Sequence, residues 1–371
     1  MAKLRDDNPN TVSRAHKENL RLKTKGDRYH MYLYSNDRIG FAVTLLPNDL
    51  DEFVSWCRTA EASGFNAVGI GDSQSLYRET FLASALALQK TTDIKVGPRV
   101  INPITRHPAV SASGVLTLEE IAPGRALLGI GTGDSSVHNA GVKPANMART
   151  KDYTIAIKEL LTKGETVYQG ETARLTWGRA DIPVYVAASG PKTLELAGEI
   201  ADGVIIQTGL LPEVVEDALN CIKKGAERAG RDFNKIDKTW FPWVNVAANK
   251  EEAIENILHS LASGAKHLGR FTTKGKHIPD SMVPLIEKVY AEYKFEQHQI
   301  PGNDNGKLIK KLGLAEYLAD RFAIVGNSKD CARKVKEAAE AGAKHFWMSV
   351  HFPNKEDFMR EWNEKVIKTV N

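Results

Sequence analysis

The chain has 371 residues, of which 42% are hydrophobic and 26% are charged, as in ordinary globular proteins. Its 50 Lys and Arg residues nearly balance its 46 Asp and Glu residues, which argues against a nucleic-acid partner. No apolar run approaches the roughly 20 residues of a membrane helix, so no membrane association is expected. The start of the chain lacks the apolar core of a signal peptide, and the three cysteines, Cys57, Cys221 and Cys331, are too sparse for a disulfide framework. We therefore expect a cytoplasmic protein.

Residues 1–30 are polar and rich in Lys and Arg, without the periodicity of a core element. We expect a flexible extension outside the core, or an arm that wraps a partner subunit.

From residue 38 onward, short β-branched runs alternate with helical patterns. The predicted strands, in chain order, are 38–46, 66–71, 94–100, 125–131, 184–188, 203–208, 239–248 and 345–350. The predicted helices are 49–64, 78–91, 108–122, 149–164, 192–201, 212–230, 250–263 and 328–342. Glycine at or near several helix ends supports these units as βα repeats.

Strands that alternate with helices are typical of a parallel sheet. The number of units and the length fit a (β/α)₈ (TIM) barrel better than an open sheet. We expect residues 31–371 to form one barrel domain. Segment 265–325 fits no single unit, so we interpret it as a helical insertion before the last strand that shapes a site or an interface.

The stretch "LLGIGTGDSS" at 127–136 carries glycines at 129, 131 and 133 directly after a predicted strand. It fails the dinucleotide-binding fingerprint because Asp134 stands where the third glycine belongs, and no Gly-Lys-Ser/Thr follows as in a P-loop. The alternatives are a tight strand exit and a glycine lining that lets a flat ring approach the backbone. In a barrel this loop lies on the C-terminal face, where active sites form.

The other strand ends carry small or polar residues. Asp72 and Ser73 follow the second strand, and Asn102, Thr105, Arg106 and His107 follow the third. After the fifth, Ser189 is placed to cap a helix beginning near Pro191, where free backbone N–H groups and Lys192 would bind an anion. We find no zinc spacing and no G-x-S-x-G elbow, so we expect no metal and no serine hydrolase.

Two segments carry a family resemblance: "GPRVINPITRHPAVSASGVLTLEEIAPGRALLGIGTGDSS" and "PVYVAASGPKTLELAGEIADGVII". The chain resembles the bacterial-luciferase-like superfamily over about residues 39–350, nearest the methylenetetrahydromethanopterin reductase branch. The resemblance implies a (β/α)₈ barrel, usually a homodimer, that binds reduced FMN or the deazaflavin F420 at its C-terminal mouth.

By position, the resemblance implies that Asp72 and Ser73 lie at the polar edge of the ring. It implies a bulge of Arg99, Val100, Ile101 and Asn102 behind the ring, often with a non-proline cis peptide. Arg99 stands where those reductases have glycine, so its side chain would crowd the ring or reach the substrate. Gly131, Gly133 and Asp134 would line the ring or its ribityl chain. The phosphate would be held by Ala188, Ser189, Gly190, Thr208 and Gly209.

Three functions fit these motifs. The lysine- and asparagine-rich composition favours a two-component monooxygenase that takes reduced FMN from a separate flavin reductase and uses O₂ on a small organic substrate. The alternative is F420-dependent hydride transfer, in which the basic run Lys266, Arg270, Lys274 and Lys276 would meet the anionic tail of F420, although that run also reads as an exposed, solvated loop. The third is a barrel that binds flavin without catalysis.

We expect Asp72 and His107 to be the catalytic residues. The unperturbed pKa of a histidine, about 6.5, suits a proton donor. The alternative is that His107 only packs at the start of a helix.

Overall fold

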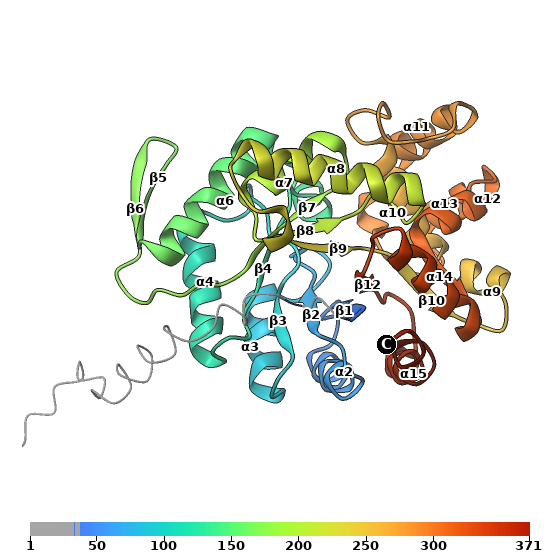
Figure 1. Ribbon diagram of the computed structural model, residues 1–371, viewed down its shortest axis with the longest axis horizontal. Coiled ribbons are helices and arrows are strands. Elements are labelled where there is room, and N and C mark those ends of the chain that lie inside the picture. The colour runs from blue at the N-terminus through green and yellow to red at the C-terminus, as the bar shows by residue number, and fades with distance from the viewer. Residues whose placement is uncertain (1–32, 34–37) are drawn as a thin grey trace, which may run out of the picture.

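The computed structural model describes residue 33 and residues 38–371. The predicted extension at residues 1–30 lies outside the described residues. A ring of parallel strands surrounded by helices makes up the body of the molecule (Figure 1).

The barrel strands follow the order β3-β2-β1-β12-β9-β8-β7-β4, and every pairing among them is parallel. Bridges from Val96 to Ala126 and from Ile101 to Ile130 join β3 to β4 and close the ring. The predicted (β/α)₈ fold is therefore confirmed. The strands are β1 (Gly40–Leu45), β2 (Ala67–Ile70), β3 (Lys95–Pro98), β4 (Leu128–Ile130), β7 (Val184–Ala188), β8 (Gly203–Ile206), β9 (Asp237–Trp240), β10 (Trp243–Val246), β11 (Ala323–Gly326) and β12 (His345–Ser349).

The helices of the βα units match the predicted periodic segments to within a few residues. Proline at the first turn of α4, α7 and α8 explains why these helices begin where they do, since its fixed φ suits that position. The helices are α2 (Leu50–Ala62), α3 (Thr80–Lys90), α4 (Pro108–Ile121), α5 (Ser135–His138), α6 (Met147–Thr162), α7 (Pro191–Ile200), α8 (Pro212–Arg228), α14 (Ser328–Glu340), α15 (Lys355–Trp362) and α16 (Lys368–Val370).

Several features differ from the predicted elements. The sequence analysis predicts no strand at β11 and no helix at α5, α15 or α16. The strand predicted at 239–248 is two strands, β9 and β10, because Phe241 and Pro242 interrupt it, and Pro242 has no N–H for the ladder. The helix predicted at 250–263 breaks at Ile257 into α9 (Lys250–Asn256) and α10 (Leu258–Gly269). Residues 165–174, predicted as loop, form an antiparallel hairpin of β5 (Glu165–Tyr168) and β6 (Glu171–Arg174).

Between β10 and β11 the chain forms α9, α10, α11 (Val283–Glu292), α12 (Asp304–Lys311) and α13 (Ala315–Phe322). These helices cover the segment 265–325 that the sequence predicts as an insertion, and they pack on one another beside the barrel (Figure 1). We call α10 together with residues 270–299 the insertion wall.

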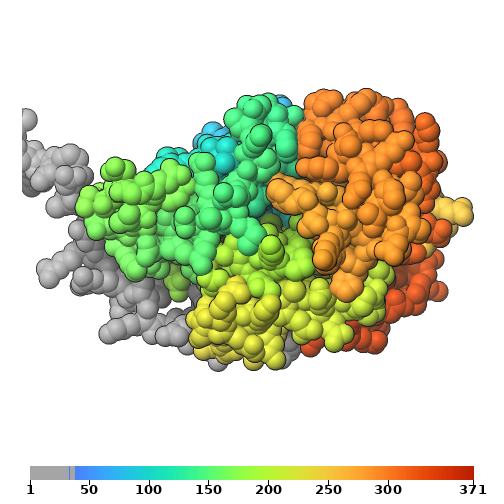
Figure 2. Space-filling view, turned by 90° about the horizontal axis from the view of Figure 1, so that it is seen from above, coloured from blue at the N-terminus to red at the C-terminus, as the bar shows by residue number. Residues whose placement is uncertain are grey.

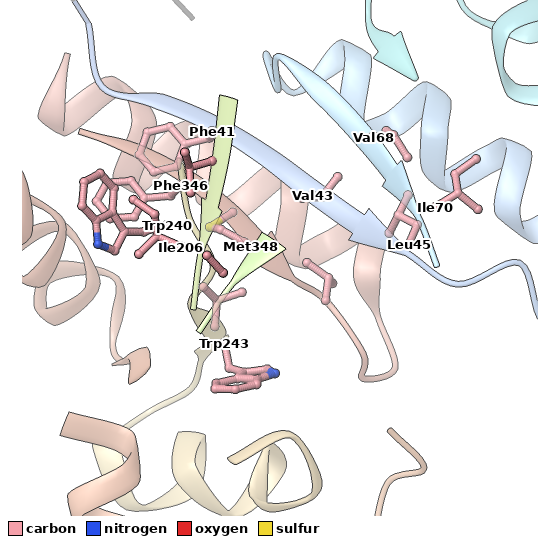
Figure 3. Packing of buried hydrophobic residues seen from close by; sticks show 14 of the residues in the cluster. Phe41, Val43, Leu45, Val68, Ile70, Ile206, Trp240, Trp243, Phe346 and Met348 are labelled. Atoms are coloured by element: carbon pink, nitrogen blue, oxygen red, sulfur yellow. The ribbon is translucent and has the colours of Figure 1, made fainter. Parts of the chain in front are cut away.

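Alternation along each strand divides the core into two layers. On β1, Phe41, Val43 and Leu45 pack outward against the helices with Val68, Phe346 and Met348 (Figure 3). The opposite face of the same strands belongs to a smaller cluster inside the barrel, made of Leu33, Ala42, Ala67, Leu127, Tyr185, Ile205 and Trp347. This inner layer fills the interior of the barrel beneath its C-terminal opening.

Candidate active site

A cleft of about 180 Å³ lies at the C-terminal ends of the strands, where the sequence places the site. Its lining comes from the ends of β1, β2, β3, β4, β7, β8, β9 and β12 with the loops that follow them, and from the insertion wall. The lining residues include Thr44, Asp72, Ser73, Tyr77, Arg99, Val100, Gly131, Gly133, Asp134, Ser135, Ser136, Ala188, Ser189, Phe241, Ser263, His267, Arg270, His298, Gln299 and His351.

Asp72 is held at the cleft by an ion pair with Arg106, which also contacts Glu79 at 2.7 Å. Burial raises the pKa of the Asp72 carboxyl above its usual range, although the neighbouring Arg106 works in the opposite direction. Burial alone would lower the pKa of Arg106, but Asp72 and Glu79 raise it above its usual value. We therefore treat the pair as ionised, with Asp72 as a fixed acceptor at one side of the cleft.

His107 lies away from the cleft. It is exposed and is the N-cap of α4, where its Nδ1 accepts a hydrogen bond from the Ala109 N–H at 3.2 Å. Its ring stands edge-on to Tyr168 of the β5–β6 hairpin, with the ring centres 5.4 Å apart. This position supports the alternative reading of His107, a residue that packs at a helix start.

The bulge after β3 has the expected non-proline cis peptide, at Arg99–Val100. Val100 packs over the glycines of β4 and its loop: a Cβ at Gly129 would lie 3.0 Å from Val100 Cγ1, and one at Gly131 would lie 2.8 Å from Val100 Cγ2. The glycines at 129 and 131 therefore first make room for the bulge. Gly131 and Val100 together form one surface of the cleft.

Arg99 neither crosses the cleft nor extends to solvent. Its guanidinium carbon lies 3.9 Å from the ring centre of Phe241 and 5.2 Å from that of Trp347. The side chain is thus directed toward the inner layer of the barrel, while the residue still lines the cleft from below.

Asn102 and Ser73 belong to a hydrogen-bonded network beside the cleft. Asn102 Nδ2 donates to Ser136 Oγ at 3.1 Å, and the hydroxyls of Ser73 and Ser135 are 2.9 Å apart. Asn102 Oδ1 also accepts from the N–H groups of residues 104 and 105. Asn102 and Ile101 are buried and do not line the cleft, so they support the loops after β3 and β4 from behind.

Asp134 joins the β4 loop to the insertion wall. Its carboxylate pairs with Lys266 of α10, and Arg270 donates to the Gly133 carbonyl oxygen at 2.9 Å. Although burial opposes ionisation, the nearby ammonium group of Lys266 holds the pKa of Asp134 well below its usual range. Figure 2 shows the orange surface of the insertion lying against the green surface that follows the β4 loop.

The expectation of an exposed basic run at 266–276 is wrong for three of its four cations. Lys266, Arg270 and Lys276 are buried, and only Lys274 is exposed. Lys266 can be buried because its ammonium group forms an ion pair with the Asp134 carboxylate. Lys276 is buried because its Nζ donates to the carbonyl oxygens of residues 267, 268 and 270 at the end of α10.

Sequence reasoning missed two histidines of this wall, His267 and His298; a third histidine of the cleft, His351, follows β12 and is not part of the wall. His267, His298 and His351 line the cleft, and burial lowers the pKa of each, that of His298 to about 3, so all three are neutral. His298 Nδ1 lies 2.7 Å from the Tyr293 hydroxyl, and His351 Nδ1 lies 2.9 Å from Ser349 Oγ. The contacts that gather them cross long stretches of chain, and no local motif indicates them.

The predicted phosphate corner lies after β7 and β8. Ala188 and Ser189 line the cleft, while Gly190, Thr208 and Gly209 lie just beyond its lining. Ser189 is not the N-cap of α7 as predicted: Gly190 is, and the Thr193 hydroxyl bonds its carbonyl oxygen at 2.9 Å. One step before the cap, Ser189 remains beside the first free amides of the helix.

Arg321 fixes the far side of this corner. Its guanidinium donates to the carbonyl oxygens of Thr208, Lys276 and His277 at 3.0, 2.6 and 2.7 Å. Gly209 has φ +120°, and a Cβ there would lie 2.7 Å from Arg321 Cγ, so this position requires glycine. The β8 loop and the segment 274–277 are therefore tied together next to the α7 N-terminus.

Within residues 33 and 38–371, no three or more His, Cys, Asp or Glu side chains are grouped so that they could hold a metal ion. Over the same residues, no helix combines the length and apolar character that a membrane crossing requires.

A parallel barrel with a polar cleft at the carboxyl ends of its strands defines a (β/α)₈ enzyme. Within that class, the family model of the luciferase-like monooxygenases matches residues 31–345, so this chain belongs to that family.

The chain is 29% identical to the 5,10-methylenetetrahydromethanopterin reductase of Methanolobus tindarius over 88% of this chain and 99% of the relative. It is 26% identical to the F420-dependent glucose-6-phosphate dehydrogenase of Kribbella flavida over 89% of this chain and 97% of the relative. The solved structure of the coenzyme F420-dependent tetrahydromethanopterin reductase of Methanopyrus kandleri superposes with a TM-score of 0.72 and 26% identity, covering 90% and 100% of the two chains. The predicted resemblance is confirmed, and the chain is an oxidoreductase.

Proposed function

We propose that this protein is an F420-dependent oxidoreductase that transfers a hydride between the deazaflavin and a small organic substrate. The observation that carries this proposal is that relatives named for F420 match almost the whole chain. The sequence analysis favours reduced FMN and a monooxygenase, with F420 as its alternative, and the relatives support the alternative. Lysine and asparagine content is a weak guide to the cofactor because surface composition follows the organism more than the site.

The cleft fits a flat, polar ring. Among the described residues, three polar atoms of its lining residues are buried without a hydrogen-bond partner: Thr44 Oγ1, Tyr77 Oη and His267 Nδ1. Thr208 Oγ1, at the predicted phosphate corner, is also buried without a hydrogen-bond partner. An unpaired buried polar atom costs about 1–3 kcal/mol. These atoms therefore support a ligand that supplies their partners.

When bound, F420 would supply hydride chemistry, since carbon replaces the flavin nitrogen at the reactive ring position. Asp72, fixed by Arg106, would accept hydrogen bonds at the polar edge of the ring. Val100 and Gly131 would support its face. The neutral histidines of the insertion wall would face the substrate and reduce the access of water.

The cofactor phosphate would sit at Ser189, Gly190, Thr208 and Gly209, where the amides at the start of α7 favour an anion. Lys192 and Lys274 are exposed. The segment carrying Lys274 lies on this helix start, since a Cβ at Gly275 would come within 3.7 Å of Pro191 Cγ. These two lysines would attract an anionic tail. The expected homodimer and the identity of the substrate stay predictions.

Binding under argon tests the proposal. We expect F420 to bind at least about tenfold more tightly than FMN, which corresponds to about 1.4 kcal/mol. Lys274→Glu should weaken F420 more than FMN, because both cofactors carry a phosphate near the start of α7 but only F420 carries the anionic tail. Lys365→Glu, a matched charge reversal at the distant end of the chain, should change neither. Tighter binding of FMN, with oxygen incorporated into product when a flavin reductase is added, would overturn the proposal in favour of the monooxygenase.

A further inference from the structure

Arg99 is a buried cation at the floor of the cleft. It follows β3 directly, forms the cis bond with Val100, and has an exposed fraction of only 8%. It lines the cleft together with Val100 and Gly131, the residues to which the proposed function assigns the face of the ring.

The structure provides a shaped seat for this side chain. Its guanidinium stacks on Phe241 at 3.9 Å, and its aliphatic stem fills space left by Gly69 of β2. A Cβ at Gly69 would lie 2.7 Å from Arg99 Cδ and 2.8 Å from Arg99 Cβ. A charge held on an aromatic face by a packed stem has few alternative positions. Its field at the cleft is therefore constant.

The charge already acts on the lining of the cleft. Burial is the main reason that the pKa of His351 lies well below its usual value, and the cations Lys355 and Arg99 lower it further.

We propose that Arg99 sets the reduction potential of the bound ring by favouring its two-electron reduced form. The inference rests on the proposed function only in placing a tricyclic ring at the bulge, and it holds for a deazaflavin and a flavin alike. Reduction would move a hydride, which is two electrons and one proton, from the substrate to the ring, and the substrate would release a further proton to water as it becomes the oxidised product. The ring would carry one more negative charge until it takes up a proton from water.

A fixed cation in a water-poor site stabilises that added charge more than the same cation would in water. Charge near the ring is one of the means by which a protein adjusts a cofactor. If the side chain of Arg99 contributes only packing, a neutral side chain of similar length would pack equally well, and the reduction potential of the bound ring would not change.

The test compares the dissociation constants of oxidised and reduced F420, and of oxidised and reduced FMN, for wild type, Arg99→Met and Arg99→Lys under argon. The ratio of the two constants gives the shift in potential, with tenfold equal to about 30 mV for two electrons. We expect Arg99→Met to lower the preference for the reduced form about tenfold. Arg99→Lys should keep most of it. Lys365→Met, which removes one distant positive charge, is the control and should show no change.

Circular dichroism and urea unfolding first establish that each variant folds, and Arg99→Gln replaces Arg99→Met if the latter does not. A ratio unchanged in the neutral variant, with F420 bound, would overturn the role of Arg99 and leave the proposed function intact. A shifted ratio with FMN as the tighter ligand would support Arg99 and overturn F420. Binding of neither cofactor would overturn both.

Discussion

At the scale of single residues, the acidic side chains that line the cleft are ionised because each is paired with a basic side chain. Asp72 and Asp134 both line the cleft, and each forms an ion pair with a cation from another loop or helix, Arg106 or Lys266. Buried ion pairs add little net stability because desolvation offsets their attraction, but removing one partner is expensive. Their main effect here is positional, since Lys266 ties the β4 loop to the insertion wall across 132 residues.

Ser189 gives a prediction at this scale. Ser189→Asp places a carboxylate one residue before the cap of α7, where it repels a phosphate and occupies the positive end of the helix. We expect cofactor affinity to fall at least about tenfold. Fluorescence titration with F420 measures it.

Ser189→Ala is the matched control and should change affinity much less, because it removes one hydroxyl without adding charge. Equal affinity of Ser189→Asp and wild type would remove this loop from the phosphate site.

At the scale of elements, the alternation of short β-branched runs with helical patterns predicts the barrel. The strands of β1 and β12 are buried on both faces, and short β-branched runs indicate such strands clearly. Proline at the first turn marks the start of three helices. What the pattern could not show is the break at Phe241–Pro242, since the run of apolar residues continues across it.

The join between β3 and β4 depends on Gly97. A Cβ at Gly97 would lie 1.9 Å from the Leu127 carbonyl oxygen, so the backbone of two neighbouring strands would have to separate. We expect Gly97→Ala to lower the free energy of unfolding by at least about 2 kcal/mol. Urea unfolding followed by circular dichroism measures it.

Gly190→Ala is the control, because its Cβ would make only an ordinary contact of 3.7 Å with Lys276 Cε. If both variants unfold at the same urea concentration, the close approach of β3 and β4 does not limit stability.

Across the whole molecule, the cleft forms only where the barrel mouth and the insertion wall meet. The sequence predicts the barrel half of the site, because Asp72, Ser73, Gly131, Asp134 and Ser189 each follow a strand and strand ends share one face. It predicts that the insertion shapes a site or an interface, but not which of its residues take part. Helix packing brings His298 to the cleft and Lys266 to Asp134, and a basic run reads as solvated until its acidic partner is known.

The insertion wall makes stability dependent on pH. The pKa of His259 is lowered to about 4 and that of His298 to about 3, chiefly by burial, and those of His267 and His351 also lie well below 6.5. In the unfolded chain these rings take up protons near pH 6.5, whereas the folded protein keeps them neutral. The unfolded state therefore binds more protons below pH 6.5, and folding weakens as pH falls from there toward the folded pKa values.

Each such histidine lowers the free energy of unfolding by up to about 1.4 kcal/mol per pH unit within that window. The carboxyls of Asp72 and Asp237, whose pKa values burial raises, act in the opposite direction only at pH values where the folded protein takes up protons on them. Urea unfolding at a series of pH values from 7.5 down to about 5 measures the slope.

We expect His298→Asn, which has no proton to take up, to lose less stability than wild type over this interval. Lys365→Asn, an exposed replacement near the end of the chain, is the control and should lose as much stability as wild type over this interval. A slope equal in wild type and His298→Asn would show that the ring is already protonated, or free to become so, in the folded protein.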